Sequence, residues 1–214
     1  MITLHGNSVS PYVRKVLAVL QLKNIAFEQT QQMPFSADDE FKKISPLGKI
    51  PALQDGDASI CDSRVICEYL DDAYPQCPVY PSDSKNKAHA RWIEELCGNQ
   101  ITEQAAGIFF QRFMRPMVLK QETDEELVEK IITKRLPPLL DYLETQVPIE
   151  GFLFGTDLQV ADISVVSPFI NAGYAGYEVD SAKWPKLASF MARVKANPVM
   201  AELLQAEAVM MGRG

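Results

Sequence analysis

The sequence predicts an α/β domain with a four-stranded mixed sheet, followed by an all-α domain. In the first 75 residues, apolar residues recur with strand and helical spacing in the order strand, helix, strand, helix, strand, strand, helix. Helices between the early strands imply a parallel crossover, and the Asp-Gly-Asp turn at 55–57 implies an antiparallel hairpin. Every later apolar stripe has helical spacing, which favours a purely helical second domain.

A proline-rich segment separates the two predicted domains. Prolines stand at positions 75, 78 and 81, and proline favours turns and extended connections. A chain of 214 residues is long enough for one large or two small domains. We therefore predict an α/β domain over residues 1–76, a linker over 77–86 and a helical domain over 87–214.

Charge and composition exclude several classes of partner. The formal net charge of −7 argues against nucleic acid, because phosphate binding needs clustered Lys and Arg. No apolar run reaches the roughly 18 to 20 residues that would span a bilayer, so we expect no membrane partner. The first six residues lack the basic and apolar regions of a secretory signal, and we expect a cytoplasmic protein.

The cysteines and histidines predict no metal site. Their spacing fits neither a CxxC pair nor a zinc ribbon, and we expect reduced thiols at Cys61, Cys67, Cys77 and Cys97. His5 and His89 are isolated from residues at ligand spacing.

The first predicted strand leads directly into a capped helix. Residues 2–5 alternate as in a strand, and Ser10 followed by Pro11 has the form of an N-cap and first helical residue. A second strand at 25–27 and a weak helix at 37–44 follow. Ser8 and Ser10 therefore lie where a strand ends and a helix begins.

The stretch 45–63 is expected to form a loop, a hairpin and a helix start. Pro51 cannot donate in a strand ladder, so it fits only a first strand residue or an edge. Such a proline can hold a cis bond and turn the backbone of Ile50 outward. With a helix start at Asp62-Ser63, this forms a corner that can bind a peptide and its carboxylate. The alternative is an ordinary hairpin.

The helical half has several recognisable boundaries. Apolar residues from Ile93 to Ile108 form one long stripe, and residues 123–126 resemble a capping box. Pro137-Pro138 is expected to interrupt the helix that follows. A helix near 156–162 has Gln159, a poor N-cap, at its cap position, so Thr156 or Asp157 could shift its start. Two last helices are predicted near 185–196 and 198–208.

The run Ser-Pro-Leu-Gly-Lys-Ile-Pro-Ala-Leu at 45–53, with Asp62-Ser63 and Leu-Asp-Asp-Ala-Tyr-Pro at 70–75, resembles the cytosolic glutathione S-transferase family. The resemblance covers nearly the whole chain and implies a thioredoxin-like first domain with glutathione as co-substrate. It also implies a homodimer with a detoxification role. Pro51 would be the family's proline, preceding the third strand.

The resemblance assigns glutathione to particular residues. Its middle residue would pair with the backbone of Ile50, and its γ-glutamyl end would meet Asp62 and Ser63. Lys49 could reach the glycyl carboxylate, or it is a solvated surface residue. Asp62 and Ser63 also fit a plain helix cap.

A helix N-terminus lowers the pKa of a thiol brought to it, and a serine hydroxyl can donate to the thiolate. Family members of the serine type place the active serine at this turn, and their Ser-x-x-x-Arg pattern is matched by Ser10 and Arg14. An alternative register selects Ser8. The alternative is that Ser10 serves only as the N-cap of the helix.

An apolar wall in the second domain is expected to receive hydrophobic electrophiles. The candidates are Phe109, Phe110, Phe113, Met114 and Tyr174. Such stripes also occur as ordinary helical core.

Two other functions remain open. A similar scaffold serves glutathione-dependent isomerisation of small unsaturated diacids of the maleylacetoacetate type, for which Arg14, Arg112 and Arg115 are candidate carboxylate ligands. Other family members are binding or regulatory proteins without activity.

Overall fold

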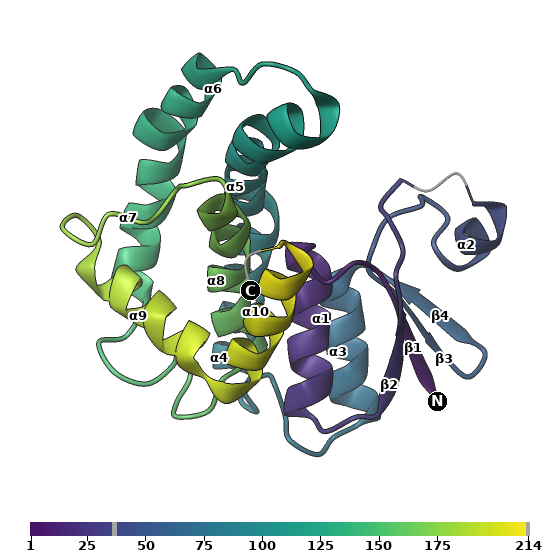
Figure 1. Cartoon of the computed structure of the whole chain (residues 1–214). Coiled ribbons are helices and arrows are strands. Elements are labelled where there is room, and N and C mark those ends of the chain that lie inside the picture. The colour runs from purple at the N-terminus through teal and green to yellow at the C-terminus, as the bar shows by residue number, and fades with distance from the viewer. Residues whose placement is uncertain (36–37, 213–214) are drawn as a thin grey trace. The chain divides into compact units, whose positions relative to one another are not determined.

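The computed structural model describes residues 1–35 and 38–212, which form two compact units (Figure 1). The first unit is built from residues 1–82 and from the C-terminal stretch that begins at Pro198. The second unit spans Asp83–Asn197. No helix of the described residues is both long enough and apolar enough to cross a membrane.

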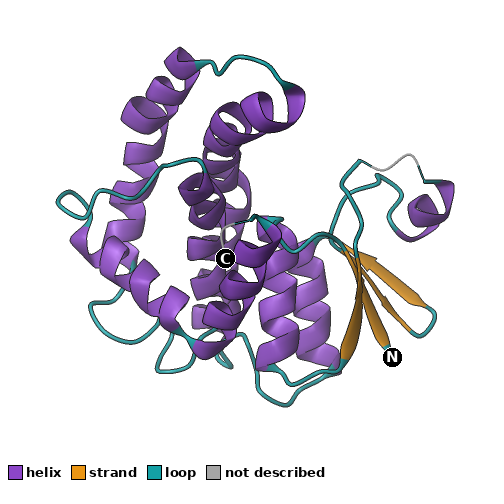
Figure 2. Cartoon of the chain, in the orientation of Figure 1, coloured by secondary structure: helices purple, strands orange, loops and turns teal. Residues whose placement is uncertain are grey.

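The first unit contains a four-stranded mixed sheet, as predicted (Figure 2). Its strands are β1 (Ile2–His5), β2 (Phe27–Thr30), β3 (Ala52–Asp55) and β4 (Ala58–Cys61). They lie in the order β2-β1-β3-β4. β1 is parallel to β2 and antiparallel to β3, and β3 is antiparallel to β4. The parallel crossover and the hairpin are therefore both present.

Helices complete this unit: α1 (Pro11–Leu22), α2 (Asp39–Ile44), α3 (Ser63–Ala73) and α10 (Pro198–Met210). α1 packs against α3 and also against α10. Leu4, Leu53 and Leu70 are fully buried and join the sheet to the helices. Of the predicted helix at 37–44, the first residue lies outside the described residues.

The second unit is helical and is organised around α8 (Val160–Tyr174), which is buried at every position from Val160 to Ala172. The remaining elements are α4 (Ser84–Leu96), the π-helical η1 (Cys97–Ile101), α5 (Thr102–Phe109), the π-helical η2 (Phe110–Leu119), α6 (Glu125–Lys130), the π-helical η3 (Ile131–Arg135), α7 (Leu136–Gln146) and α9 (Pro185–Ala196). α8 packs against α4, η1, α5 and α9.

The predicted proline interruption falls at the junction of η3 and α7. Pro137 and Pro138 stand in the first turn of α7, where their missing N–H groups cost little. The turn before them widens into the π-helical segment η3. The long stripe from Ile93 to Ile108 is likewise divided between α4 and α5 by η1.

The start of α8 shows how a poor cap residue is accommodated. Gln159 is the N-cap, and its Oε1 is buried without a hydrogen-bond partner in the described part of the chain. The Asp162 carboxylate accepts the N–H groups of Gln159 and Leu153, both at 2.8 Å. Because Asp162 takes up these donors, the helix begins at Val160 rather than shifting to Thr156 or Asp157.

The ends of the predicted domains differ from the compact units. α4 begins at Ser84, capped by Asp83, inside the segment expected to be a linker. Residues from Pro198 onward were expected in the helical domain over 87–214, yet α10 packs on α1 in the first unit. The predicted domains over 1–76 and 87–214 and the linker over 77–86 stay a prediction.

Candidate functional site

The sheet register brings three predicted segments to one edge of the first unit. Ala52, the first residue of β3, pairs with His5 at the end of β1 and with Cys61 at the end of β4. The chain that follows His5 leads to Ser8 and Ser10, the chain before Ala52 holds Ile50-Pro51, and Cys61 is followed by Asp62. Segments far apart in sequence are thus neighbours at this edge.

Gly6 allows the closest of these approaches. A Cβ built on it would lie 2.5 Å from Val13 Cγ2 on α1 and 3.3 Å from Ile50 Cβ. Its φ of +151° also lies in a region that side chains rarely adopt. The absence of a side chain therefore lets the Ile50 segment, the end of β1 and the first turn of α1 meet.

The peptide bond between Ile50 and Pro51 is cis. The loop before it is fixed by a hydrogen bond of 2.7 Å from Ser45 Oγ to the carbonyl of Lys49. Within residues 1–35 and 38–212, the backbone N–H and C=O of Ile50 have no hydrogen-bond partner. The Lys49 side chain is exposed and Ile50 is partly exposed.

Asp62 is the N-cap of α3 and Ser63 is its first residue. Asp62 Oδ1 accepts the N–H groups of Arg64 at 2.9 Å and Val65 at 3.4 Å, so the expected cap role is present. The carboxylate is exposed and has a second oxygen, which makes no hydrogen bond to other described residues. Capping and ligand binding are therefore compatible in this residue.

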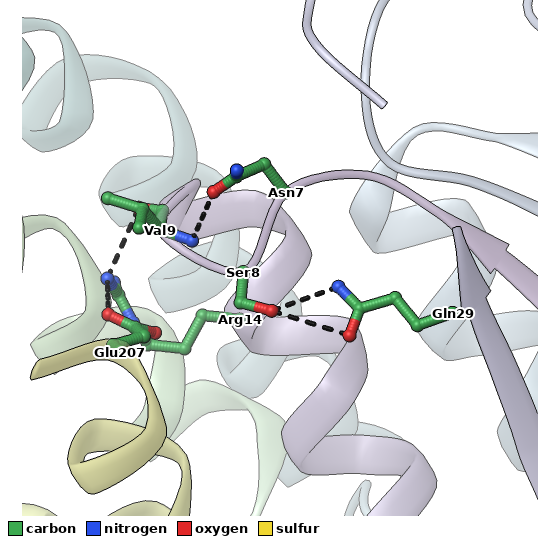
Figure 3. A network of polar contacts seen from close by, with 6 residues as sticks. All are labelled: Asn7, Ser8, Val9, Arg14, Gln29 and Glu207. Atoms are coloured by element: carbon green, nitrogen blue, oxygen red, sulfur yellow. Dashed lines mark hydrogen bonds and ion pairs between the residues drawn. The ribbon is translucent and has the colours of Figure 1, made fainter. Parts of the chain in front are cut away.

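The two candidate serines differ in how their hydroxyls are engaged. Ser8 Oγ accepts a hydrogen bond of 2.9 Å from Gln29 Nε2 (Figure 3). Gln29 Nε2 also donates to the carbonyl of Gly6 at 2.8 Å. Ser10 is the N-cap of α1, but its side chain makes no cap hydrogen bond. Among the described residues its hydroxyl has no partner. Ser10 thus presents a free hydroxyl at a helix N-terminus, where the local potential is positive.

Arg14 is committed to a buried ion pair. Its side chain is fully buried, and Nε and Nη2 each lie 2.6 Å from one carboxylate oxygen of Glu207 on α10. Nη2 also donates to the carbonyl of Val9 at 3.3 Å. Arg112 forms an ion pair of 2.8 Å with Glu125 in the second unit. These two guanidinium groups therefore already have carboxylate partners.

The sequence did not single out Gln29 or Glu207. No signal marks Gln29, a polar residue in a short strand. Glu207 follows Met200 and Leu203 at helical spacing, so the pattern places it on the buried face of α10. A carboxylate on an apolar face requires a partner, and this was the available clue.

The predicted apolar wall lies in the second unit. The rings of Phe109 and Phe113 are stacked with centroids 4.9 Å apart, and Phe110 is 44% exposed. Phe113 and Met114 lie on η2, and Tyr174 is the last residue of α8. The structure brings Phe109 and Phe113 together, and the role of the wall as an electrophile pocket stays a prediction.

A groove of about 440 Å³ lies at the opposite edge of the sheet from the predicted site, beside Ile2 and Asp55. There Asp55 Oδ2 accepts hydrogen bonds from Tyr69 at 2.9 Å and Tyr74 at 2.6 Å. The bond to Asp55, with burial, raises the pKa of Tyr74 to about 12. The groove shares no residue with the predicted site. No group of three His, Cys, Asp or Glu side chains within the described ranges could hold a metal ion.

Comparisons with known proteins point in one direction. Residues 4–78 match the family model for the glutathione S-transferase N-terminal domain, and residues 109–207 match the model for the C-terminal domain. A glutathione S-transferase of Triticum aestivum is 30% identical over 188 residues, which cover 86% of this chain and 84% of that protein. Glutathione S-transferase Z2 of Arabidopsis thaliana is 32% identical over 155 residues, covering 72% and 67%.

Solved structures show the same fold. Human glutathione-S-transferase T1-1 in its apo form has a TM-score of 0.86 and 24% identity, covering 98% of this chain and 89% of that one. A glutathione S-transferase from Rhodospirillum rubrum F11 has a TM-score of 0.83 and 23% identity, covering 95% and 92%.

Proposed function

Because the chain belongs to the glutathione S-transferase family, we propose that it binds reduced glutathione at the edge of the sheet and transfers it to hydrophobic electrophiles. One observation carries the proposal. The strand pairing at Ala52 brings three segments to one edge of the sheet. They carry the free hydroxyl of Ser10, the unpaired backbone N–H and C=O of Ile50 and the exposed carboxylate of Asp62.

Each part of glutathione has a complementary group there. The backbone N–H and C=O of Ile50 receive the cysteinyl residue in the manner of an added strand. Asp62 and Ser63 take the ammonium and carboxylate of the γ-glutamyl end, and charge-assisted hydrogen bonds of this kind are the stronger ones. The exposed ammonium of Lys49 reaches toward the glycyl carboxylate.

The chemistry needs no nucleophile from the protein. A free thiol has a pKa of about 8.5, and lowering it by about two units makes it mostly ionised at neutral pH. Ser10 donates a hydrogen bond to the sulfur, and the N-terminus of α1 favours its negative charge. The thiol proton leaves to solvent. The thiolate then attacks an electrophilic carbon, forming a C–S bond as a leaving group departs or an electron pair moves into a conjugated acceptor.

The electrophile is held by the apolar wall of Phe109, Phe110, Phe113, Met114 and Tyr174. An apolar pocket of this kind admits many hydrophobic compounds and selects weakly among them. We also expect the protein to be a homodimer and to be cytoplasmic, as the family resemblance implies. The molar mass in solution measures the oligomeric state.

Calorimetric titration with reduced glutathione tests the binding site. The wild type is expected to bind, and Asp62→Ala to lose most of the binding. Asp62→Asn separates the loss of charge from the loss of the helix cap, because asparagine still caps α3 but carries no charge. Absence of heat with the folded wild type would contradict the proposal.

Substitution of the serines tests the chemistry. With an activated aryl chloride as electrophile, Ser10→Ala should lower turnover well over tenfold with little change in glutathione affinity. This is the pattern expected when a variant loses an interaction that acts on the reaction rather than on binding. Ser8→Ala is the control, and a larger loss there would move the role to Ser8.

The two alternatives receive less support. The diacid isomerase needs free cationic groups, and two of its three candidates, Arg14 and Arg112, are paired with Glu207 and Glu125. Arg115 has no carboxylate partner among the described residues and is the one candidate cation that remains. Turnover of a small unsaturated diacid would favour it. Tight glutathione binding without turnover of any electrophile would favour a binding protein.

A further inference from the structure

We propose that Glu207, on the last helix, is a positioning residue for the reaction at Ser10 and acts through Arg14 and the carbonyl of Val9. The inference rests on the proposed function. Arg14 and Glu207 are 193 positions apart in sequence but form one buried ion pair in the first unit.

The contacts run from α10 to the serine turn in two steps (Figure 3). Glu207 holds the guanidinium of Arg14 with two bonds of 2.6 Å. Such bidentate pairs fix the plane and the direction of the guanidinium. Arg14 Nη2 then donates to the carbonyl of Val9 at 3.3 Å, and Val9 directly precedes Ser10. Glu207 is 1% exposed, so water does not compete for this arrangement.

The rest of the serine turn is held from other sides. Asn7 Oδ1 accepts the N–H of Val9 at 2.9 Å, and the carbonyl of Asn7 accepts the N–H of Ser10 at 3.0 Å. Gln29 binds Ser8 Oγ and the carbonyl of Gly6. Both backbone polar groups of Val9 are thus engaged. Arg14 supplies the bond on the side of α10, next to the one serine hydroxyl that is left free.

The ion pair acts by position and not by charge. Arg14 and Glu207 together carry no net charge, so their field at the serine turn is small compared with that of a lone guanidinium. A placement error of about 1 Å at a reacting group can cost on the order of a hundredfold in rate. The two modes of action, by position and by charge, predict opposite changes in the pKa of the glutathione thiol when only one partner of the ion pair is neutralised.

The primary experiment removes the whole pair without changing the net charge. Replacing a buried ion pair by apolar residues of similar volume is often tolerated, so Arg14→Met with Glu207→Met is expected to fold. We expect kcat with an aryl chloride to fall about tenfold or more, while KM for glutathione changes by less than about threefold. Thiolate absorbance of bound glutathione, titrated against pH, should show a raised thiol pKa.

A matched control is available at the other end of α1. Lys23 Nζ lies 3.1 Å from Asp71 Oδ1 and also donates to the carbonyls of Gln76 and Cys77. It is likewise a buried ion pair of the first unit that holds a backbone segment. Lys23→Met with Asp71→Met should lower the melting temperature but leave the kcat and the thiol pKa unchanged.

The single variant Glu207→Gln separates position from charge. The uncompensated guanidinium by itself would lower the thiol pKa, whereas loosening of the Val9 contact raises it and lowers kcat. The conservative variant Glu207→Asp keeps the charge and should lose less activity than Glu207→Gln.

Several outcomes would overturn the inference. The folded double variant of Arg14 and Glu207 could keep the wild-type kcat and thiol pKa. The Lys23 and Asp71 control could lose as much kcat as that double variant. Glu207→Gln could show a lowered thiol pKa with unchanged kcat. Wild-type protein that shows no thiolate absorbance with glutathione overturns the proposed function itself, and the inference with it.

Discussion

At the scale of single residues, the engagement of a hydroxyl decides which serine is suited to hold a thiolate. A serine has only one O–H donor. Ser8 Oγ accepts a hydrogen bond of 2.9 Å from Gln29 Nε2, and its own O–H donates to Gln29 Oε1 at 3.4 Å, while Ser10 Oγ has no partner in the described ranges. Ser10 is the cap residue of α1 yet leaves the cap bond unmade. The structure thus favours Ser10 by availability rather than by position in a motif.

Gly6→Ala tests the close approach behind the site. The added Cβ would collide with Val13 Cγ2 at 2.5 Å, and the φ of +151° is strained for alanine. We expect a loss of about 1–3 kcal/mol in the free energy of unfolding, as for overpacked cores. Glutathione affinity should fall as well, because Ile50 would move. Chemical denaturation and calorimetry measure both, and unchanged values would contradict the packing described. Gly56→Ala is the control for backbone strain alone, because Gly56 also has a positive φ of +61° but lies in open space.

Asp62 combines a cap with an unfavourable backbone. Its φ of 72° and ψ of 127° lie outside the regions common for side-chain residues, and such conformations cost about 1–3 kcal/mol. Asp62→Gly relieves this cost and loses little capping, so it should be more stable than Asp62→Ala. Both variants should lose glutathione affinity. Equal stability of the two variants in urea unfolding would count against backbone strain at this residue.

At the scale of secondary structure, Gln159 and Asp162 are arranged as a capping box at the start of α8, but the Gln159 side chain does not complete its hydrogen bond. Asp162 accepts the N–H of Gln159, but Gln159 Oε1 has no partner among the described residues. Gln159→Ser places a good cap acceptor there and should raise the free energy of unfolding by about 0.5–2 kcal/mol. Gln159→Ala removes the amide without adding a cap. The difference between the two variants in thermal unfolding therefore measures the cap, and a difference of zero would refute it.

The same helix start predicts a dependence of stability on pH. Burial raises the pKa of Asp162 to about 7, although the N–H groups of Leu153 and Gln159 lower it. A raised pKa means that the folded chain binds the proton more tightly than the unfolded chain, whose carboxyl has a pKa of about 3.9. This contribution is complete below about pH 4 and is lost as the pH rises toward about 7.

Asp162→Asn should remove that slope. The wild type is expected to lose on the order of 1 to 4 kcal/mol relative to Asp162→Asn between about pH 4 and pH 7, at about 1.4 kcal/mol per pKa unit. Urea unfolding at several pH values measures the difference. Parallel curves for the two proteins would show that Asp162 does not titrate in this range.

At the scale of the whole molecule, the last helix belongs to the unit that starts the chain. α10 buries Met200, Leu203 and Glu207, and Glu207 neutralises the fully buried Arg14. A chain that ends at Asn197 would leave this guanidinium without its carboxylate partner, and breaking a buried pair costs about 3–5 kcal/mol. We expect amide protons of β1 to exchange much faster in the truncated chain than in the full chain. Unchanged protection of β1 would contradict this role of α10.

Much of the first unit could be predicted because its signals are local. Strand alternation at 2–5, the Asp-Gly-Asp turn and the proline at position 51 each act within a few residues, and the sheet that they predict is present. The partner of Arg14 could not be predicted in this way, because a long side chain finds its partner in space and not in sequence. The packing of α10 on the first unit could not be predicted for the same reason, since its spacing reveals an amphipathic helix but not the surface it covers.

The sequence by itself determined the class of the fold, the order of its elements, the start of α1 at Pro11 and the membership of a family, because these depend on periodicity, turn chemistry and short motifs. Only the tertiary structure decided which serine keeps a free hydroxyl, which carboxylate neutralises Arg14 and which unit α10 completes. These depend on hydrogen bonds and buried charges between distant segments. A buried polar group must be paired, but the fold chooses the partner.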